Sequence, residues 1–90
     1  MNQAPSIGRI VHVTLQDHRN DLIIRPGIIV RTWPDAAGNP TECINVQVFA
    51  DGNGQAHLND GLPAVVWKTS VHYREKAGEQ GMTWSWPAKA

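Results

Sequence analysis

The fold is decided by one stretch of the sequence, Cys43-Ile44-Asn45-Val46-Gln47-Val48-Phe49, in which apolar and polar side chains alternate. The three β-branched residues share one face of an extended chain, and the residues between them share the other face. A strand with this period packs one face on a core and leaves the other face nearer to solvent. We therefore predict a β-strand over residues 43–49.

Further segments on both sides of this stretch have the composition of short strands. They span residues 7–15, 28–33, 64–73 and 82–86, with 22–24 as an additional short strand. We expect Arg25-Pro26-Gly27 to break or bulge the chain after residue 24, because proline cannot donate a hydrogen bond to a strand ladder. The connections at 34–41, 51–63 and 74–81 are rich in residues that favour turns.

Short strands joined by turn-rich connections predict an all-β domain. Its 90 residues are enough for one small core, so we expect a five- to six-stranded barrel of the SH3-like type, with an OB-like barrel as the second choice. Residues 7–87 would form the barrel, residues 1–6 a flexible N-terminus, and residues 88–90 a C-terminal tail. The short last strand would leave an edge for pairing between subunits, which favours a homo-oligomer.

The composition limits the partners that this chain can have. Eight Lys and Arg residues balance eight Asp and Glu residues, so no overall field attracts nucleic acid non-specifically or an anionic membrane. Cys43 is the only cysteine, which rules out an internal disulfide and favours a reducing compartment. No signal peptide or long apolar run is visible. We expect a soluble protein of the cytoplasm.

One motif suggests catalysis. His12-Val13-Thr14-Leu15 matches the His-x-Thr cassette that looks like one half of a two-histidine phosphodiesterase site. That chemistry needs a second copy, so that one histidine acts as base and the other as acid. The nearest candidate, around His72, has Arg74 where a hydroxyl is needed. A small phosphodiesterase that uses His12 is therefore a hypothesis that we rank below the two binding hypotheses given at the end of this section.

Metal and cofactor sites are not indicated by the sequence. Residues 51–55 begin like a calcium loop, but Ala56 stands where glycine is required and Leu62 where a bidentate glutamate is required. The four histidines do not have the spacing of a zinc site. We expect no metal, no cofactor and no catalytic residues, and thus a protein that is not an enzyme.

Cations and aromatic rings lie close together along the predicted strands. A guanidinium group can give a phosphate two parallel hydrogen bonds, and an indole ring can stack on a nucleobase. Trp84 and Trp86 share one face with Met82, as core residues would, whereas Trp33 and Trp67 fit either the core or a binding surface. The candidate ligand-binding residues are Arg25, Arg31, Trp33, Asn45, Trp67, Lys68, Thr69, Ser70, Tyr73 and Arg74.

Several segments carry a family pattern that extends over most of residues 7–87. They are Ile7–His12, Arg25–Trp33, Asn45–Phe49, Asp51-Gly52, Asn59–Gly61, Val66–Val71 and Thr83–Pro87. Together these segments resemble a family of small proteins encoded by bacteriophages and prophages, which usually have no assigned function. The resemblance implies a phage origin. Small neutral phage proteins include virion parts, inhibitors of host proteins, and proteins that sequester immune nucleotide signals.

Two binding hypotheses follow from the residues and the resemblance. The first is a non-enzymatic, oligomeric protein that sequesters a small phosphorylated or nucleotide-like immune signal, an anti-defence sponge. Trp33 and Trp67 would stack the base, and Arg31, Lys68 and Arg74 would meet phosphates. The alternative is a protein-binding module or minor virion component that inhibits or docks on a host or phage protein, with its tryptophans in the core or at a hot spot.

Overall fold

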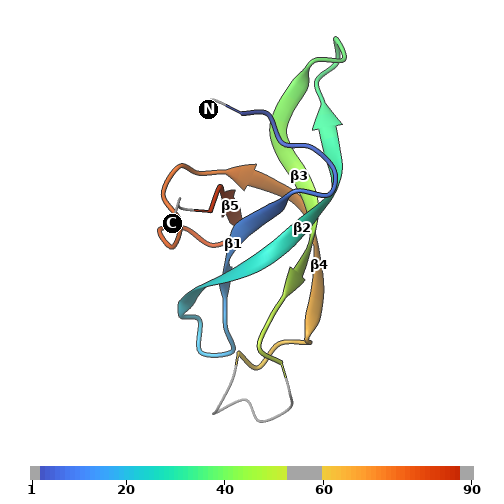
Figure 1. Ribbon diagram of the computed structural model, residues 1–90. Coiled ribbons are helices and arrows are strands. Elements are labelled where there is room, and N and C mark those ends of the chain that lie inside the picture. The colour runs from blue at the N-terminus through green and yellow to red at the C-terminus, as the bar shows by residue number, and fades with distance from the viewer. Residues whose placement is uncertain (1–2, 53–59, 88–90) are drawn as a thin grey trace.

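The computed structural model describes residues 3–52 and 60–87, which form five β-strands and no helix (Figure 1). The strands are β1 (Ile10–Gln16), β2 (Leu22–Pro34), β3 (Pro40–Phe49), β4 (Val65–Tyr73) and β5 (Thr83–Ser85). Each strand pairs with the next one in the sequence, and β5 also pairs with β1, so the sheet closes into a barrel. This confirms the predicted small all-β barrel. The sequential strand order favours the SH3-like type over the Greek-key order of the OB fold.

The barrel is closed by its shortest strand. Three residues of β5 pair antiparallel with β1, and two of them pair in parallel with β4. Because the described strands form a complete ring, the terminal strand leaves no free edge of the kind from which a homo-oligomer was expected. The oligomeric state itself stays a prediction.

The core lies inside the ring and is made of side chains that face inward from all five strands. Trp84 is its largest member and is 0% exposed; its Nε1 atom donates to the carbonyl oxygen of Glu42 at 2.7 Å. Tyr73 and Trp86 contact the Trp84 ring edge to face, with centroid distances of 4.9 and 5.1 Å. The fully or nearly fully buried apolar residues are Val11, Val13, Leu15, Ile29, Ile44, Val46, Val48, Val71 and Trp84. The alternation along residues 43–49 and the core position of Trp84 are therefore confirmed.

The predicted break at Arg25-Pro26-Gly27 is wrong, because β2 runs without interruption through Pro26. Pro26 is the register partner of His12 on β1, whereas the pairing of β2 with β3 begins only at Gly27. On the β3 side the missing N–H of Pro26 therefore costs no ladder hydrogen bond. The pairing of β2 with β3 is irregular at two other places, at Val30, between the pairs made by Ile29 and Arg31, and between Thr32 and Pro34.

Met82 does not belong to the core face on which the sequence pattern put it. It precedes β5, has a φ of 58° and is 42% exposed. Its N–H donates to the carbonyl oxygen of Thr14 at 2.8 Å. The left-handed backbone at this residue ends the alternation, so only Thr83–Ser85 are extended.

Candidate functional site

Asn45 is the centre of a polar cluster on the outer face of the barrel. Its neighbours in β3 point into the core, so its own side chain points outward, yet it is only 6% exposed. Its Oδ1 atom accepts three hydrogen bonds, from Nε1 of Trp33 at 2.9 Å, Oγ1 of Thr69 at 2.8 Å and the N–H of Ser70 at 3.0 Å. The indole and backbone N–H groups can only donate, and this settles which amide atom faces them.

Both strands that flank Asn45 carry an additional residue at this level. On β2, Val30 lies between the residues paired with Val46 and Asn45. On β4, Thr69 and Ser70 together face the single residue Asn45, and Ser70 has a φ of 55°. Bulges of this kind redirect side chains away from the regular pleat. They turn the Ser70 N–H and the Thr69 hydroxyl toward the Asn45 side chain.

Arg31 and Trp33 form a cation–π pair on the same face. The guanidinium carbon of Arg31 lies 4.0 Å from the centroid of the Trp33 ring. The indole is held at Nε1 by Asn45, so the orientation of the ring does not depend on the arginine. Within the described ranges Arg31 forms no ion pair with a carboxylate, and its side chain is exposed. The pair therefore presents an ordered positive charge that is open to an anion.

Trp67 lies on this outer face as well. It is the register partner of Gln47, which stands two residues from Asn45 and therefore on the same side of β3, about 7 Å along the strand. The Trp67 side chain is 54% exposed. Six of the ten predicted residues thus share one face of β2, β3 and β4, and we call them the outer shelf: Arg31, Trp33, Asn45, Trp67, Thr69 and Ser70.

The structure does not bring the other four predicted residues to the outer shelf. Lys68 follows Trp67 in a strand and therefore points to the opposite side, where it lines a cavity at one end of the barrel. Tyr73 packs on the core through Trp84. Arg74 is engaged in the β4–β5 connection, with its Nε 3.5 Å from Oε1 of Glu79. Closeness in sequence alone could not distinguish these four residues from the six that lie on the outer shelf.

Arg25 is bound to an acidic residue that the sequence analysis did not single out. Its Nε donates to Oδ2 of Asp60 at 2.7 Å, and its second terminal nitrogen donates to Oδ1. These hydrogen bonds lower the pKa of Asp60 and raise the pKa of Arg25. The guanidinium is thus occupied within the fold. No local sequence signal links the two residues, because they are 35 positions apart.

The His12-x-Thr14 motif does not form an open site. The Thr14 side chain is buried beneath the β4–β5 connection, with 1% exposure, and its Oγ1 accepts the N–H of Gly78 at 2.9 Å. Thr83 and Ser85 also contact that connection through their hydroxyl groups, each of which donates to one of its backbone carbonyl groups. The Thr14 hydroxyl, which a phosphodiesterase site would need to be accessible, is therefore buried and hydrogen-bonded within the fold.

The part of the chain that the structure describes contains neither a metal-binding cluster nor a membrane-spanning helix. No three His, Cys, Asp or Glu side chains come close enough there to hold a metal ion. Most of the calcium-like stretch at 51–55 lies outside the described residues. No helix in the described ranges is long and apolar enough to span a bilayer. Comparison of the chain with models of known families, with curated proteins and with solved structures finds no match.

Proposed function

We propose that this protein is a non-enzymatic binding protein that captures a small, planar, phosphorylated ligand on the outer shelf. The observation that carries this proposal is the Arg31 guanidinium 4.0 Å from the Trp33 ring, on an indole that Asn45 holds in place. A charged group that is already ordered loses less conformational entropy when its ligand binds. Such a pair suits an anion with a flat ring system.

The shelf offers a distinct contact for each part of such a ligand. The exposed ring of Trp67 can stack on a base, which contributes about 1–3 kcal/mol. Arg31 can donate two parallel hydrogen bonds to a phosphate. The amide nitrogen of Asn45 has no hydrogen-bond partner among the described residues, and with the Thr69 and Ser70 hydroxyls it can serve a sugar. Arg31 is the one cation of the outer shelf, so the shelf suits a ligand with one phosphate better than a polyanion. The net charge of zero also disfavours a polyanionic ligand.

The finer form of the proposal concerns the ligand's origin. The resemblance to phage and prophage proteins supports a nucleotide-like immune signal of the bacterial host as the ligand. The protein would then be an anti-defence sponge that acts as a homo-oligomer in the host cytoplasm. A sponge works by binding without turnover, so it needs no catalytic group on the shelf.

Calorimetric titration tests the proposal. The panel is AMP, ADP-ribose and cyclic dinucleotides, with inorganic phosphate as the chemical control. At least one planar phosphorylated compound should bind saturably. Arg31→Leu should weaken that binding at least tenfold, while Arg74→Leu, whose guanidinium pairs with Glu79 instead, should leave it within about twofold. Absence of saturable binding across the panel, or equal binding by Arg31→Leu, contradicts the proposal.

A second candidate, a protein-docking module, is favoured by apolar side chains on the same sheet face. Phe49 and Val65 are register partners next to the shelf, and both are exposed. Ile10 extends this apolar surface on β1 through its pairing with Ile28. Protein hot spots combine such residues with tryptophan and arginine. Phe49→Ser separates the two candidates, because it would weaken docking of a protein and leave nucleotide binding unchanged.

A further inference from the structure

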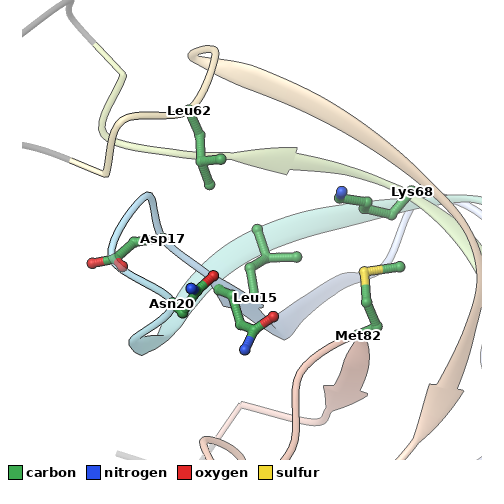
Figure 2. A pocket seen from close by; sticks show the side chains of 7 residues that line it. Leu15, Asp17, Asn20, Leu62, Lys68 and Met82 are labelled. Carbon is green, nitrogen blue, oxygen red and sulfur yellow. The ribbon is translucent and has the colours of Figure 1, made fainter. Parts of the chain in front are cut away.

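A cavity of about 280 Å³ lies where the β1–β2 turn, β4 and the start of β5 meet (Figure 2). Its apolar lining residues are Leu15, Leu62 and Met82. Lys68 extends its ammonium group toward the space between the two leucines (Figure 2). This cavity is on the inner side of β4, whereas the outer shelf is on the other side of the same strand.

The charge of Lys68 is not balanced by the acidic residue that also lines the cavity. The carboxylate of Asp17 points away from the space (Figure 2). Its Oδ1 accepts the backbone N–H groups of Arg19 at 2.8 Å and Asp21 at 3.0 Å, and its Oδ2 faces the Arg19 guanidinium at 3.3 Å. Within residues 3–52 and 60–87 Lys68 forms no ion pair. A single ammonium group therefore stands in a cavity whose walls are partly apolar.

The rim of the cavity contains two residues with an uncommon backbone. Met82 has a φ of 58° and Asn20 a φ of 64°. Asparagine accepts this conformation readily, but a long unbranched residue such as methionine rarely does. Such outliers persist where surrounding contacts hold them, and they gather at ligand sites. The flexible thioether of Met82 also makes an adaptable wall for an apolar ligand.

From these observations we propose that the cavity binds a small organic monoanion, of the class of medium-chain carboxylates. Lys68 would neutralise the carboxylate, and the amides of Gln16 and Asn20, which also line the cavity, would supply hydrogen bonds. One cation suits one negative charge, and the side chains of Leu15, Leu62 and Met82 favour a carboxylate that carries an alkyl chain. At about 30 Å³ for each non-hydrogen atom, as for a water molecule, the space holds on the order of ten such atoms. Octanoate has this size.

The experiment is a titration of the full chain with octanoate, followed by calorimetry and by methyl NMR. Octanamide is the neutral probe of the same length. Octanoate should bind saturably at one site and shift the methyl signals of Leu15, Leu62 and Met82, while octanamide binds at least tenfold more weakly. Lys68→Met keeps the length of the side chain and should remove this preference for the anion. Lys76→Met, an exposed lysine of the β4–β5 connection, is the matched control and should bind octanoate normally.

A second variant keeps the test valid if Lys68→Met fails to fold. Leu62→Trp fills the space without touching the charge, and it should abolish octanoate binding. Arg31→Leu should leave octanoate binding unchanged, so this result is independent of the outer shelf. Equal affinity for octanoate and octanamide would overturn the proposal, as would the absence of saturable binding or methyl shifts confined to residues outside the cavity.

Discussion

Arg25 and Asp60 form a bidentate ion pair that joins β2 to the connection between β3 and β4. The Asp60 side chain is only 4% exposed, and its Oδ2 also accepts the backbone N–H of Asp51 at 2.8 Å. The backbone N–H of Asp60 in turn donates to the carbonyl oxygen of Asp51 at 2.9 Å. One carboxylate thus holds both ends of the connection and attaches them to the barrel.

Replacement of this carboxylate should destabilise the fold. Asp60→Asn keeps the shape of the side chain but removes the charge and one acceptor from Arg25, so we expect a loss of about 2 kcal/mol in the free energy of unfolding. Urea denaturation measures it. The control is Asp21→Asn, whose carboxylate pairs with Arg19 at the exposed surface and should contribute less than about 1 kcal/mol. Equal losses for the two variants would contradict a special role for Asp60.

The same ion pair predicts how stability depends on pH. The hydrogen bonds from Arg25 hold the pKa of Asp60 below its ordinary value of 3.8. A lowered pKa in the folded state gives stability that is complete above the unfolded value and is lost as the pH falls through the folded value. The stability difference between the natural protein and Asp60→Asn should be constant above about pH 5 and shrink below about pH 4. Urea denaturation curves across this pH range measure the difference. If the difference is unchanged down to about pH 2, the Asp60 carboxylate is not its cause.

Gly27→Ala should destabilise the barrel through overpacking. A Cβ atom at this position would lie 2.7 Å from Cγ2 of Val46 and 3.2 Å from Cγ2 of Val13, inside the core between β1 and β3. We expect a cost of about 1–3 kcal/mol, measured by urea denaturation. Gly81→Ala is the control, because its Cβ would meet its neighbours at 3.6 Å or more. Val46→Ala should recover part of the loss in the double variant.

Asn45→Leu should release Trp33. The variant keeps the size of the side chain but removes the acceptor of three hydrogen bonds and leaves the indole N–H without this partner. We expect a loss of about 2 kcal/mol and faster hydrogen exchange of the Trp33 indole N–H, followed by NMR. Gln47→Leu, the next outward residue of β3, should change neither quantity by a comparable amount.

Trp67→Ala should separate binding from stability. The ring is more than half exposed, so its removal should change the free energy of unfolding by less than about 1 kcal/mol. If a base stacks on it, affinity for the ligand should fall about 5- to 150-fold. Trp84→Ala is the opposite case, because loss of the largest buried side chain should cost about 3–5 kcal/mol. Calorimetric binding and thermal unfolding, compared for the two variants, check both statements.

The sequence pattern predicts the barrel because alternation along β3 depends only on which residues are apolar. It also favours a core position for Trp84, which the structure shows to be fully buried. It fails at Met82, where a left-handed backbone ends the alternation. It also fails at Pro26, because the cost of a proline depends on where the neighbouring strand ends. Both failures concern partners that lie far away in sequence.

The candidate site could be predicted in part for the same reason. Trp67 and Lys68 are neighbours in sequence, but strand geometry sends them to opposite sides of β4. The sequence marks Asn45 only as one of ten candidate ligand-binding residues, and its central role depends on bulges in β2 and β4 that no local signal marks. Arg25 has the chemistry of a phosphate ligand, but its use is decided by Asp60, which approaches only after the chain has folded.

The pairing of β5 with β1, which we call the seam, closes the barrel and limits the order in which its strands can assemble. The pairs β1–β2, β2–β3 and β3–β4 join strands that follow each other in the chain, so each can form as a hairpin, with a longer connection between β3 and β4 than in the other two. The seam pairs Val13 with Trp84, and the entropy of closing so long a loop must be lost before its contacts stabilise anything. We therefore expect β5 to dock late in folding. We expect substitutions in this strand mainly to accelerate unfolding and so to shorten the kinetic lifetime of the native state.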